Sequence, residues 1–155
     1  MHLYEDIKAE IIGNMKEKRN NPEKAEYYNV IIAAFKSIKA KGEAIAKERK
    51  VEVNTDIMFE ALLKEQKELK QTLDTTPDSS PLHATAAIQL EAINRYAPRK
   101  LSYEKLYTEI EDIVKTQHFK NFGEAMKYCR EYFKFTADGK DISTILKDLD
   151  IDFYR

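Results

Sequence analysis

Apolar residues recur every three or four positions along almost the whole chain, and this spacing constrains the fold more than any other feature. Near the N-terminus, Leu3, Ile7 and Ile11 are each four residues apart, and Met15 continues the series. Side chains at this spacing form one stripe along a helix, which such a helix buries. The alternating pattern of a strand is nearly absent. The chain is therefore predicted to be all-α.

Cap residues and prolines divide this pattern into separate helices. The first helix is expected over about residues 3–18, because Asn21 followed by Pro22 is a good start for a second one. The second helix is expected to fray or kink near Gly42, since glycine is a poor helix former. The apolar face expected on this second helix consists of Tyr28, Ile31, Ile32, Phe35 and Ile38.

Two further helices are expected between the second helix and Pro98. Asn54 or Thr55 is a suitable start for the third, and Ser80 followed by Pro81 is a suitable start for the fourth. Their expected buried residues are Met58, Leu62, Leu69 and Leu73, and then Ala84, Ala87, Ile88, Ala92 and Tyr96.

Ala97 and Pro98 mark the expected boundary between two units. A residue before proline is disfavoured in the α conformation, so the fourth helix should end there. We expect a four-helix N-terminal unit over residues 1–97 and a smaller three-helix unit over residues 98–155. Expected features of the second unit are Ser102, Asn121 and Asp141 as N-caps, a capping box between Asn121 and Glu124, and a turn at Asp138 and Gly139.

The balance of charges excludes some classes of protein. The chain has 26 Lys and Arg against 27 Asp and Glu, a net charge of −1, which argues against a uniformly basic nucleic-acid-binding protein. The longest apolar run, Val30–Phe35, is too short to cross a bilayer, so we expect no membrane association. The single cysteine, Cys129, fits a reducing compartment, and we expect a cytoplasmic location.

No catalytic or metal-binding signature stands out. The three histidines, His2, His83 and His118, fall on different predicted elements. The acidic residues near the C-terminus resemble the first half of a calcium loop but lack its glycine and its final glutamate. No glycine-rich phosphate or dinucleotide motif is present. We therefore expect no cofactor and no metal, and we assign no catalytic residue.

Basic residues nevertheless concentrate in three stretches. Six bases and two acids between Lys36 and Lys50 give a local charge of +4. The stretches from Arg95 to Lys105 and from Lys115 to Lys140 each have a charge of +3. Contacts to phosphates require such local concentration, not a high net charge. The alternative is that each stretch is an ordinary solvated helix face.

Four stretches of the sequence together resemble one family. They are Leu3-x-x-x-Ile7 with Met15-Lys16; Ile32–Glu43; Leu63–Lys67 with Tyr96–Ser102; and Phe122–Lys127 followed by Ala137–Lys140. In this order and spacing they resemble the GatB/YqeY family, which comprises stand-alone YqeY-like proteins and the tail domain of the tRNA amidotransferase B subunit. The resemblance spans nearly the whole chain.

The resemblance implies an all-α protein of four and then three helices, and an association with tRNA. Together with the basic stretches, it leads us to expect a non-catalytic tRNA-binding module that reads RNA shape through its phosphates. The residues expected to contact phosphates are Lys36, Lys39, Lys41, Arg99, Lys100, Lys120, Lys127 and Lys140. Four motif residues, Gly123, Met126, Asp138 and Gly139, are expected to serve helix entry, a tight turn and the core, with Met126 and Cys129 buried.

Two alternatives remain open from the sequence. The first is a protein–protein adaptor that docks on an aminoacyl-tRNA synthetase or an amidotransferase subunit, with Tyr103, Tyr107 or Phe122 as anchors. The second, ranked last, is carbon–nitrogen ligase activity with glutamine as amide donor. It would be inherited by family association, since no residue here supports it.

Overall fold

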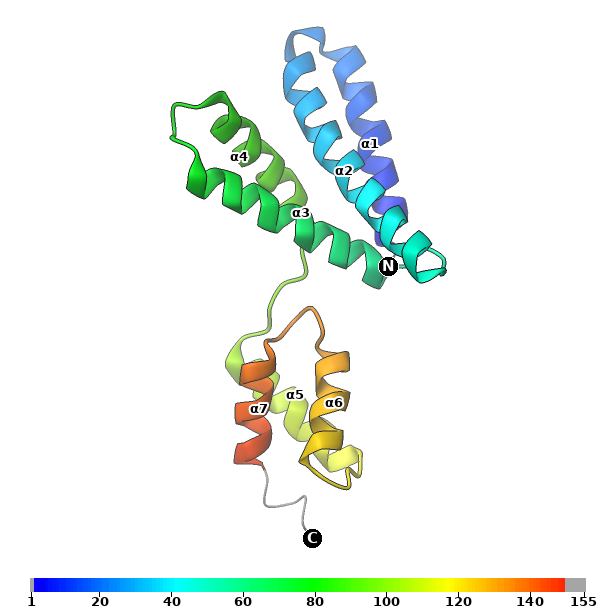
Figure 1. The fold of residues 1–155 in the computed structure, drawn as a ribbon, viewed down its shortest axis with the longest axis vertical. Coiled ribbons are helices and arrows are strands. Elements are labelled where there is room, and N and C mark those ends of the chain that lie inside the picture. The colour runs from blue at the N-terminus through cyan, green and yellow to red at the C-terminus, as the bar shows by residue number, and fades with distance from the viewer. Residues whose placement is uncertain (1, 150–155) are drawn as a thin grey trace. The chain divides into compact units, whose positions relative to one another are not determined.

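The computed structural model describes residues 2–149, and these residues form seven α-helices and one short 3₁₀ helix, without a strand. The all-α prediction is confirmed. The contacts divide the chain between Ala97 and Pro98 into two compact units, called here the N-terminal unit and the C-terminal unit (Figure 1). The elements are α1 (Leu3–Asn20), η1 (Pro22–Lys24), α2 (Ala25–Arg49), α3 (Thr55–Thr75), α4 (Pro81–Asn94), α5 (Tyr103–Thr116), α6 (Phe122–Tyr132) and α7 (Gly139–Asp148).

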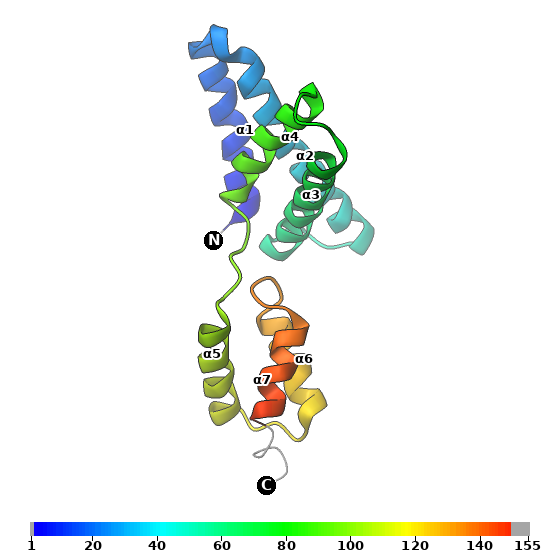
Figure 2. The same cartoon turned by 90° about the vertical axis from the view of Figure 1, so that its left-hand side faces the viewer.

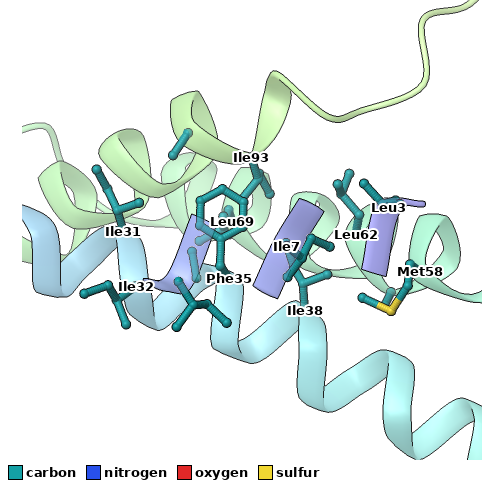
Figure 3. Packing of buried hydrophobic residues seen from close by; sticks show 14 of the residues in the cluster. Leu3, Ile7, Ile31, Ile32, Phe35, Ile38, Met58, Leu62, Leu69 and Ile93 are labelled. Carbon is teal, nitrogen blue, oxygen red and sulfur yellow. The ribbon is translucent and has the colours of Figure 1, made fainter. Parts of the chain in front are cut away.

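The N-terminal unit consists of two antiparallel helix pairs, α1 with α2 and α3 with α4 (Figures 1 and 2). Helices α2 and α3 each contact the other three helices, so these two form the centre of the unit. The buried side chains labelled in Figure 3 come from all four helices and include Phe35 and Ile38 of α2, which are fully buried. The apolar face predicted for α2 is therefore largely confirmed, with Tyr28 only partly buried.

Two of the predicted apolar stripes are partly wrong. Met15 is 37% exposed, although Leu3, Ile7 and Ile11 of the same series are buried. A spacing of four residues advances the stripe by about 40° at each step in a helix of 3.6 residues per turn, so Met15 has rotated out of the core. In α4, the predicted Ala84 and Ala87 are exposed, and the buried residues are Ala86, Ala92 and Ile93.

Four predicted helix starts are confirmed by hydrogen bonds. The side chains of the N-cap residues Asn54, Ser80, Ser102 and Asn121 accept bonds from the backbone N–H groups of Ile57, Leu82, Lys105 and Glu124. Glu124 departs from the capping-box pattern, because its carboxylate accepts from the backbone N–H of Lys120 at 3.0 Å. That bond still joins the segment before α6 to the first turn of the helix.

Of two other predicted caps, Asn21 does precede a helical segment with Pro22 at its first position but makes no side-chain cap bond, and Asp141 is not a cap. The Asn21 side chain bonds backwards to the carbonyl of Glu17 at 3.1 Å, and a 3₁₀ turn follows it. Asp141 lies within the first turn of α7, because the helix already begins at Gly139. Asp138 and Gly139 therefore form the helix entry, and the turn before them is made by residues 133–136.

The expected kink at Gly42 is also wrong, because α2 continues through this residue to Arg49. Gly42 is buried where α2 approaches α3. A Cβ atom added to it would lie 2.3 Å from Sδ of Met58 and 3.7 Å from Cβ of Ala61. The glycine therefore serves a close helix–helix approach rather than a break in the helix.

We expect Gly42→Ala to lower the free energy of unfolding by up to about 2 kcal/mol. Overpacking against the fully buried Met58 costs about 1–3 kcal/mol, and the better helix propensity of alanine offsets about 1 kcal/mol of it. The matched control is Gly13→Ala in α1, where an added Cβ meets no atom within 4 Å, so it should gain up to about 1 kcal/mol. Urea denaturation measures both. Equal gains in the two variants would contradict the close approach.

The C-terminal unit is built around α7, which contacts both α5 and α6. Its core consists of Leu106, Ile110, Ala125, Cys129, Phe133, Ile142, Ile145 and Leu146. The backbone N–H of Leu101 donates to the carbonyl of Thr136 at 2.8 Å, which fastens the start of the unit to the turn before α7. Cys129 is buried as expected, whereas Met126 is only partly buried.

Candidate nucleic-acid interface

The first basic stretch lies on α2, and two of its three candidate lysines have carboxylate partners within the protein. Nζ of Lys39 lies 3.1 Å from Oε1 of Glu43. Nζ of Lys41 contacts Glu65 and lies 2.8 Å from Oε2 of Glu68. Lys36 is exposed, and no hydrogen bond or ion pair joins its side chain to another residue within 2–149. Of the three candidates, Lys36 is therefore the one whose side chain has no carboxylate partner among the described residues.

Glu65 explains why Lys41 is held in place. It is the one charged residue that is buried among those the structure describes, at 7% exposure, and its carboxylate also accepts from the hydroxyl of Ser37. Partial burial opposes the charge on Lys41, but the carboxylates of Glu65 and Glu68 outweigh this effect and raise the pKa of its ammonium group. This network joins α2 to α3, and a buried carboxylate requires such partners. Lys41 therefore stabilises the contact between α2 and α3 through its ion pairs with Glu65 and Glu68.

The candidates around the boundary between the units differ in the same way. Arg99 lies in the segment between α4 and α5 and is exposed. Nζ of Lys100 forms an ion pair with the carboxylate of Asp138, the N-cap residue of α7. Asp138 makes no side-chain cap bond, although it is the N-cap residue of α7. Lys120 is exposed just before α6.

Lys127 shares a shallow groove on α6 with Arg130. The groove has a volume of about 400 Å³ and is lined by Phe122, Gly123, Met126, Lys127, Arg130 and Glu131. Phe122 and Met126 pack against the core of the C-terminal unit and form an apolar floor. Gly123 lies in the first turn of α6, as expected for a residue at a helix entry.

Arg130 also reaches the start of α7. A Cβ atom added to Gly139 would lie 3.4 Å from Nε of Arg130. The guanidinium therefore lies close against Gly139, which directly precedes Lys140. No hydrogen bond or ion pair joins the side chain of Lys127, Arg130 or Lys140 to another residue within 2–149. We call these three residues the cationic cluster. Lys127 and Arg130 line the same groove, and Arg130 lies against Gly139, the residue that Lys140 follows in α7.

Sequence reasoning counted Arg130 in the local charge but did not select it as a site residue. Its position three residues after Lys127 was a usable signal, because residues at that spacing are neighbours on a helix surface. Its proximity to Gly139 was not accessible, because it depends on how α6 and α7 pack.

Cys129 provides a chemical probe of the C-terminal core. Its side chain is fully buried, and burial raises the pKa of the thiol to about 11. Since the thiolate is the reactive species, we expect an aromatic disulfide reagent at pH 8 to modify the native protein far more slowly than the urea-unfolded protein. Rapid labelling of the native protein would contradict the described packing of α6.

The described residues contain no group of three or more His, Cys, Asp or Glu side chains that could hold a metal ion. No helix within residues 2–149 has the length and apolar character needed to cross a membrane. Asp150 and Asp152 belong to the acidic series near the C-terminus that resembles the first half of a calcium loop, and they lie outside the described residues.

Comparison with known proteins agrees with the resemblance in the sequence. No curated protein matches the chain. The YqeY family model, described as Yqey-like protein, matches residues 4–149 and therefore covers helices of both units. The chain belongs to the YqeY-like family.

Proposed function

We propose that this protein is a non-catalytic accessory module that binds tRNA through the phosphate backbone, as its resemblance to the amidotransferase tail domain implies. The observation that carries the proposal is the cationic cluster of Lys127, Arg130 and Lys140, three exposed bases without a carboxylate partner among the described residues. Exposed cations without a carboxylate partner can contact a phosphate without first giving up an ion pair. Arginine adds a planar fork that suits phosphate oxygens.

The paired lysines have a secondary place in this proposal. Lys39, Lys41 and Lys100 would each have to release a carboxylate before contacting a phosphate. Such an exchange recovers little free energy, because one ion pair replaces another. Exposed residues without that cost are Lys36, Arg99, Lys120, Lys127, Arg130 and Lys140.

A non-catalytic role fits the chemistry of the described residues. The single thiol is buried and has a raised pKa, which is unsuited to a nucleophile. His83, in the first turn of α4, lies 3.3 Å from the hydroxyl of Thr76 and 3.5 Å from the carboxylate of Asp78. The Thr76 hydroxyl donates to the carbonyl of Thr72 at 2.6 Å, so its proton is directed away from the imidazole that would have to accept it. We also propose that the protein acts in the cytoplasm, where a lone thiol stays reduced.

Fluorescence anisotropy with labelled tRNA across a series of salt concentrations tests this proposal. Neutralisation of about three phosphates predicts that log K falls against log salt with a slope of about −2 to −3. The absence of binding at low salt would overturn the proposal. So would binding that does not respond to salt, because phosphate contacts release counterions.

A protein–protein adaptor is the second candidate, and the exposure of Tyr103 favours it. Tyr103 is 47% exposed at the start of α5, and its ring centroid lies 6.5 Å from that of Tyr107. Tyrosines of this kind are frequent anchors in interfaces. The Tyr107 hydroxyl bonds to Asp148, and Phe122 is partly buried, so Tyr103 is the best available anchor of the three expected. Retention of a synthetase or amidotransferase subunit after nuclease treatment would support this role.

We further propose that the two units are independently folding domains, residues 1–97 and 98–155, of four and three helices. Each has its own buried cluster of apolar side chains. Phe133→Ala tests this division, because it removes a core side chain of the C-terminal unit alone.

A further inference from the structure

Three aromatic side chains around α6 form a continuous series of ring contacts on the surface of the C-terminal unit. The ring centroids of Phe119 and Tyr128 are 5.4 Å apart, and those of Tyr128 and Tyr132 are 6.1 Å apart with planes inclined by only 15°. Tyr132 in turn meets the buried Phe133 edge-on at 4.8 Å. We call Phe119, Tyr128 and Tyr132 the aromatic row.

The aromatic row is accessible and its rings are held in place. Tyr128 is 37% exposed and Tyr132 is 62% exposed. Neither hydroxyl group forms a hydrogen bond with another residue within 2–149, so the tyrosines are not fixed by polar contacts. Their orientation comes from ring packing, which ends on Phe133 in the core. An orientation fixed before binding lowers the entropic cost of binding a planar group.

The charges on α6 differ between the aromatic row, where the charged residues three or four positions from Tyr128 are acidic, and the groove, where two bases stand against Glu131. On a helix, Glu124 and Glu131 lie four residues before and three residues after Tyr128, so both neighbour the aromatic row. Carboxylates there repel phosphates. Two members of the cationic cluster, Lys127 and Arg130, line the groove on the same helix, together with Glu131. A nucleic acid would therefore present its backbone to the cluster and its bases to the row.

We propose that the aromatic row stacks unpaired nucleobases of an RNA whose backbone lies on the cationic cluster. This inference rests on the proposed RNA-binding function and adds a ligand class to it, namely single-stranded loops or bulges. Paired bases inside a duplex expose no face for stacking, whereas unpaired bases stack readily on aromatic side chains. The combination of aromatic rings and nearby cations is the usual means of binding single strands without sequence preference.

The test compares an RNA hairpin carrying an unpaired purine loop with a fully paired duplex of the same length. Tyr132→Leu should weaken binding of the hairpin by roughly five- to 100-fold, the usual contribution of one stacked base, and leave binding of the duplex unchanged. Tyr132→Phe should retain hairpin binding, because the ring remains. The matched control is Tyr103→Leu, which removes an exposed tyrosine outside the row.

A measurement on the wild-type protein makes the test independent of how the variants fold. Saturating hairpin should shift the ring-proton resonances of Tyr128 and Tyr132 upfield and leave those of Tyr103 unchanged. Unshifted resonances, or equal binding of hairpin and duplex, would overturn the stacking proposal. Salt-dependent binding in that case would leave the proposed function intact. If neither RNA binds at low salt, both proposals fail.

A protein partner gives a different outcome. If Tyr132→Leu binds the hairpin normally but loses a protein that wild type retains after nuclease treatment, then the row is a protein-docking surface and the stacking proposal is wrong.

Discussion

Phe133→Ala is expected to unfold the C-terminal unit and to leave the N-terminal unit folded. Phe133 is 1% exposed and is the largest side chain in the core that α5, α6 and α7 share. Loss of a buried phenylalanine costs about 3–5 kcal/mol. Stability of about 0.05–0.15 kcal/mol per residue gives a unit this small only several kcal/mol in total. The substitution therefore removes most or all of the stability of the unit.

Two measurements separate the units in this variant. The thiol of Cys129, which lies in the same core, should react with an aromatic disulfide reagent at pH 8 as fast as in urea. Circular dichroism should lose part of its helical signal, and the remainder should melt in the cooperative transition of the N-terminal unit. The control is Glu131→Ala at an exposed position two residues away, which should change stability by no more than about 0.5 kcal/mol.

The opposite result is equally informative. If Phe133→Ala causes the whole helical signal to disappear in one transition, the two units fold as one cooperative structure. The proposed domain boundary between Ala97 and Pro98 would then be wrong, although the described contacts divide the chain there.

Helix starts were predictable where a local interaction decides them. Asn54, Ser80, Ser102 and Asn121 each bond to a backbone group two or three residues ahead, so the sequence contains both partners. The failures occurred where a competing contact prevails. Asn21, for example, bonds backwards to Glu17, which closes α1 instead of opening α2.

Residues that act through distant partners were not predictable from spacing. Gly42 suggested a kink because glycine is a poor helix former, but its role depends on Met58 across the helix pair. Lys41 and Lys100 counted as free charges in the sequence. Their partners Glu65 and Asp138 lie 24 and 38 residues away. Local charge therefore overestimated the number of cations available to a ligand.

The residues of the candidate interface could likewise be chosen only in part from the sequence. Lys127 and Lys140 were selected from the sequence, and both remain exposed without a partner within residues 2–149. Arg130 joins them only because α6 packs beside the start of α7 and because Gly139 has no side chain there. The packing of α6 against α7 therefore places Arg130 beside the residue that precedes Lys140.

Simultaneous replacement of Lys127, Arg130 and Lys140 by glutamine is therefore expected to cause the largest loss of RNA binding of any triple substitution on the described surface. Each exposed pair with a phosphate contributes about 0.2–1 kcal/mol, so three contacts together correspond to roughly a threefold to 150-fold loss of affinity. The slope of log K against log salt should flatten by about 2–3, since each lost contact removes about one unit. Anisotropy titrations with tRNA measure both quantities. Glutamine keeps most of each side chain, so the fold should be preserved.

The matched control removes three positive charges from α3, by substitution of Lys64, Lys67 and Lys70 with glutamine. These lysines are exposed, and the change in net charge is the same. A loss that depends only on net charge would be equal in the two triple variants and would leave no role for a local site. A loss confined to the α6–α7 variant requires phosphates to contact that cluster. Both triple variants change the long-range field by a similar amount, whereas only the α6–α7 variant removes short-range contacts at the cluster.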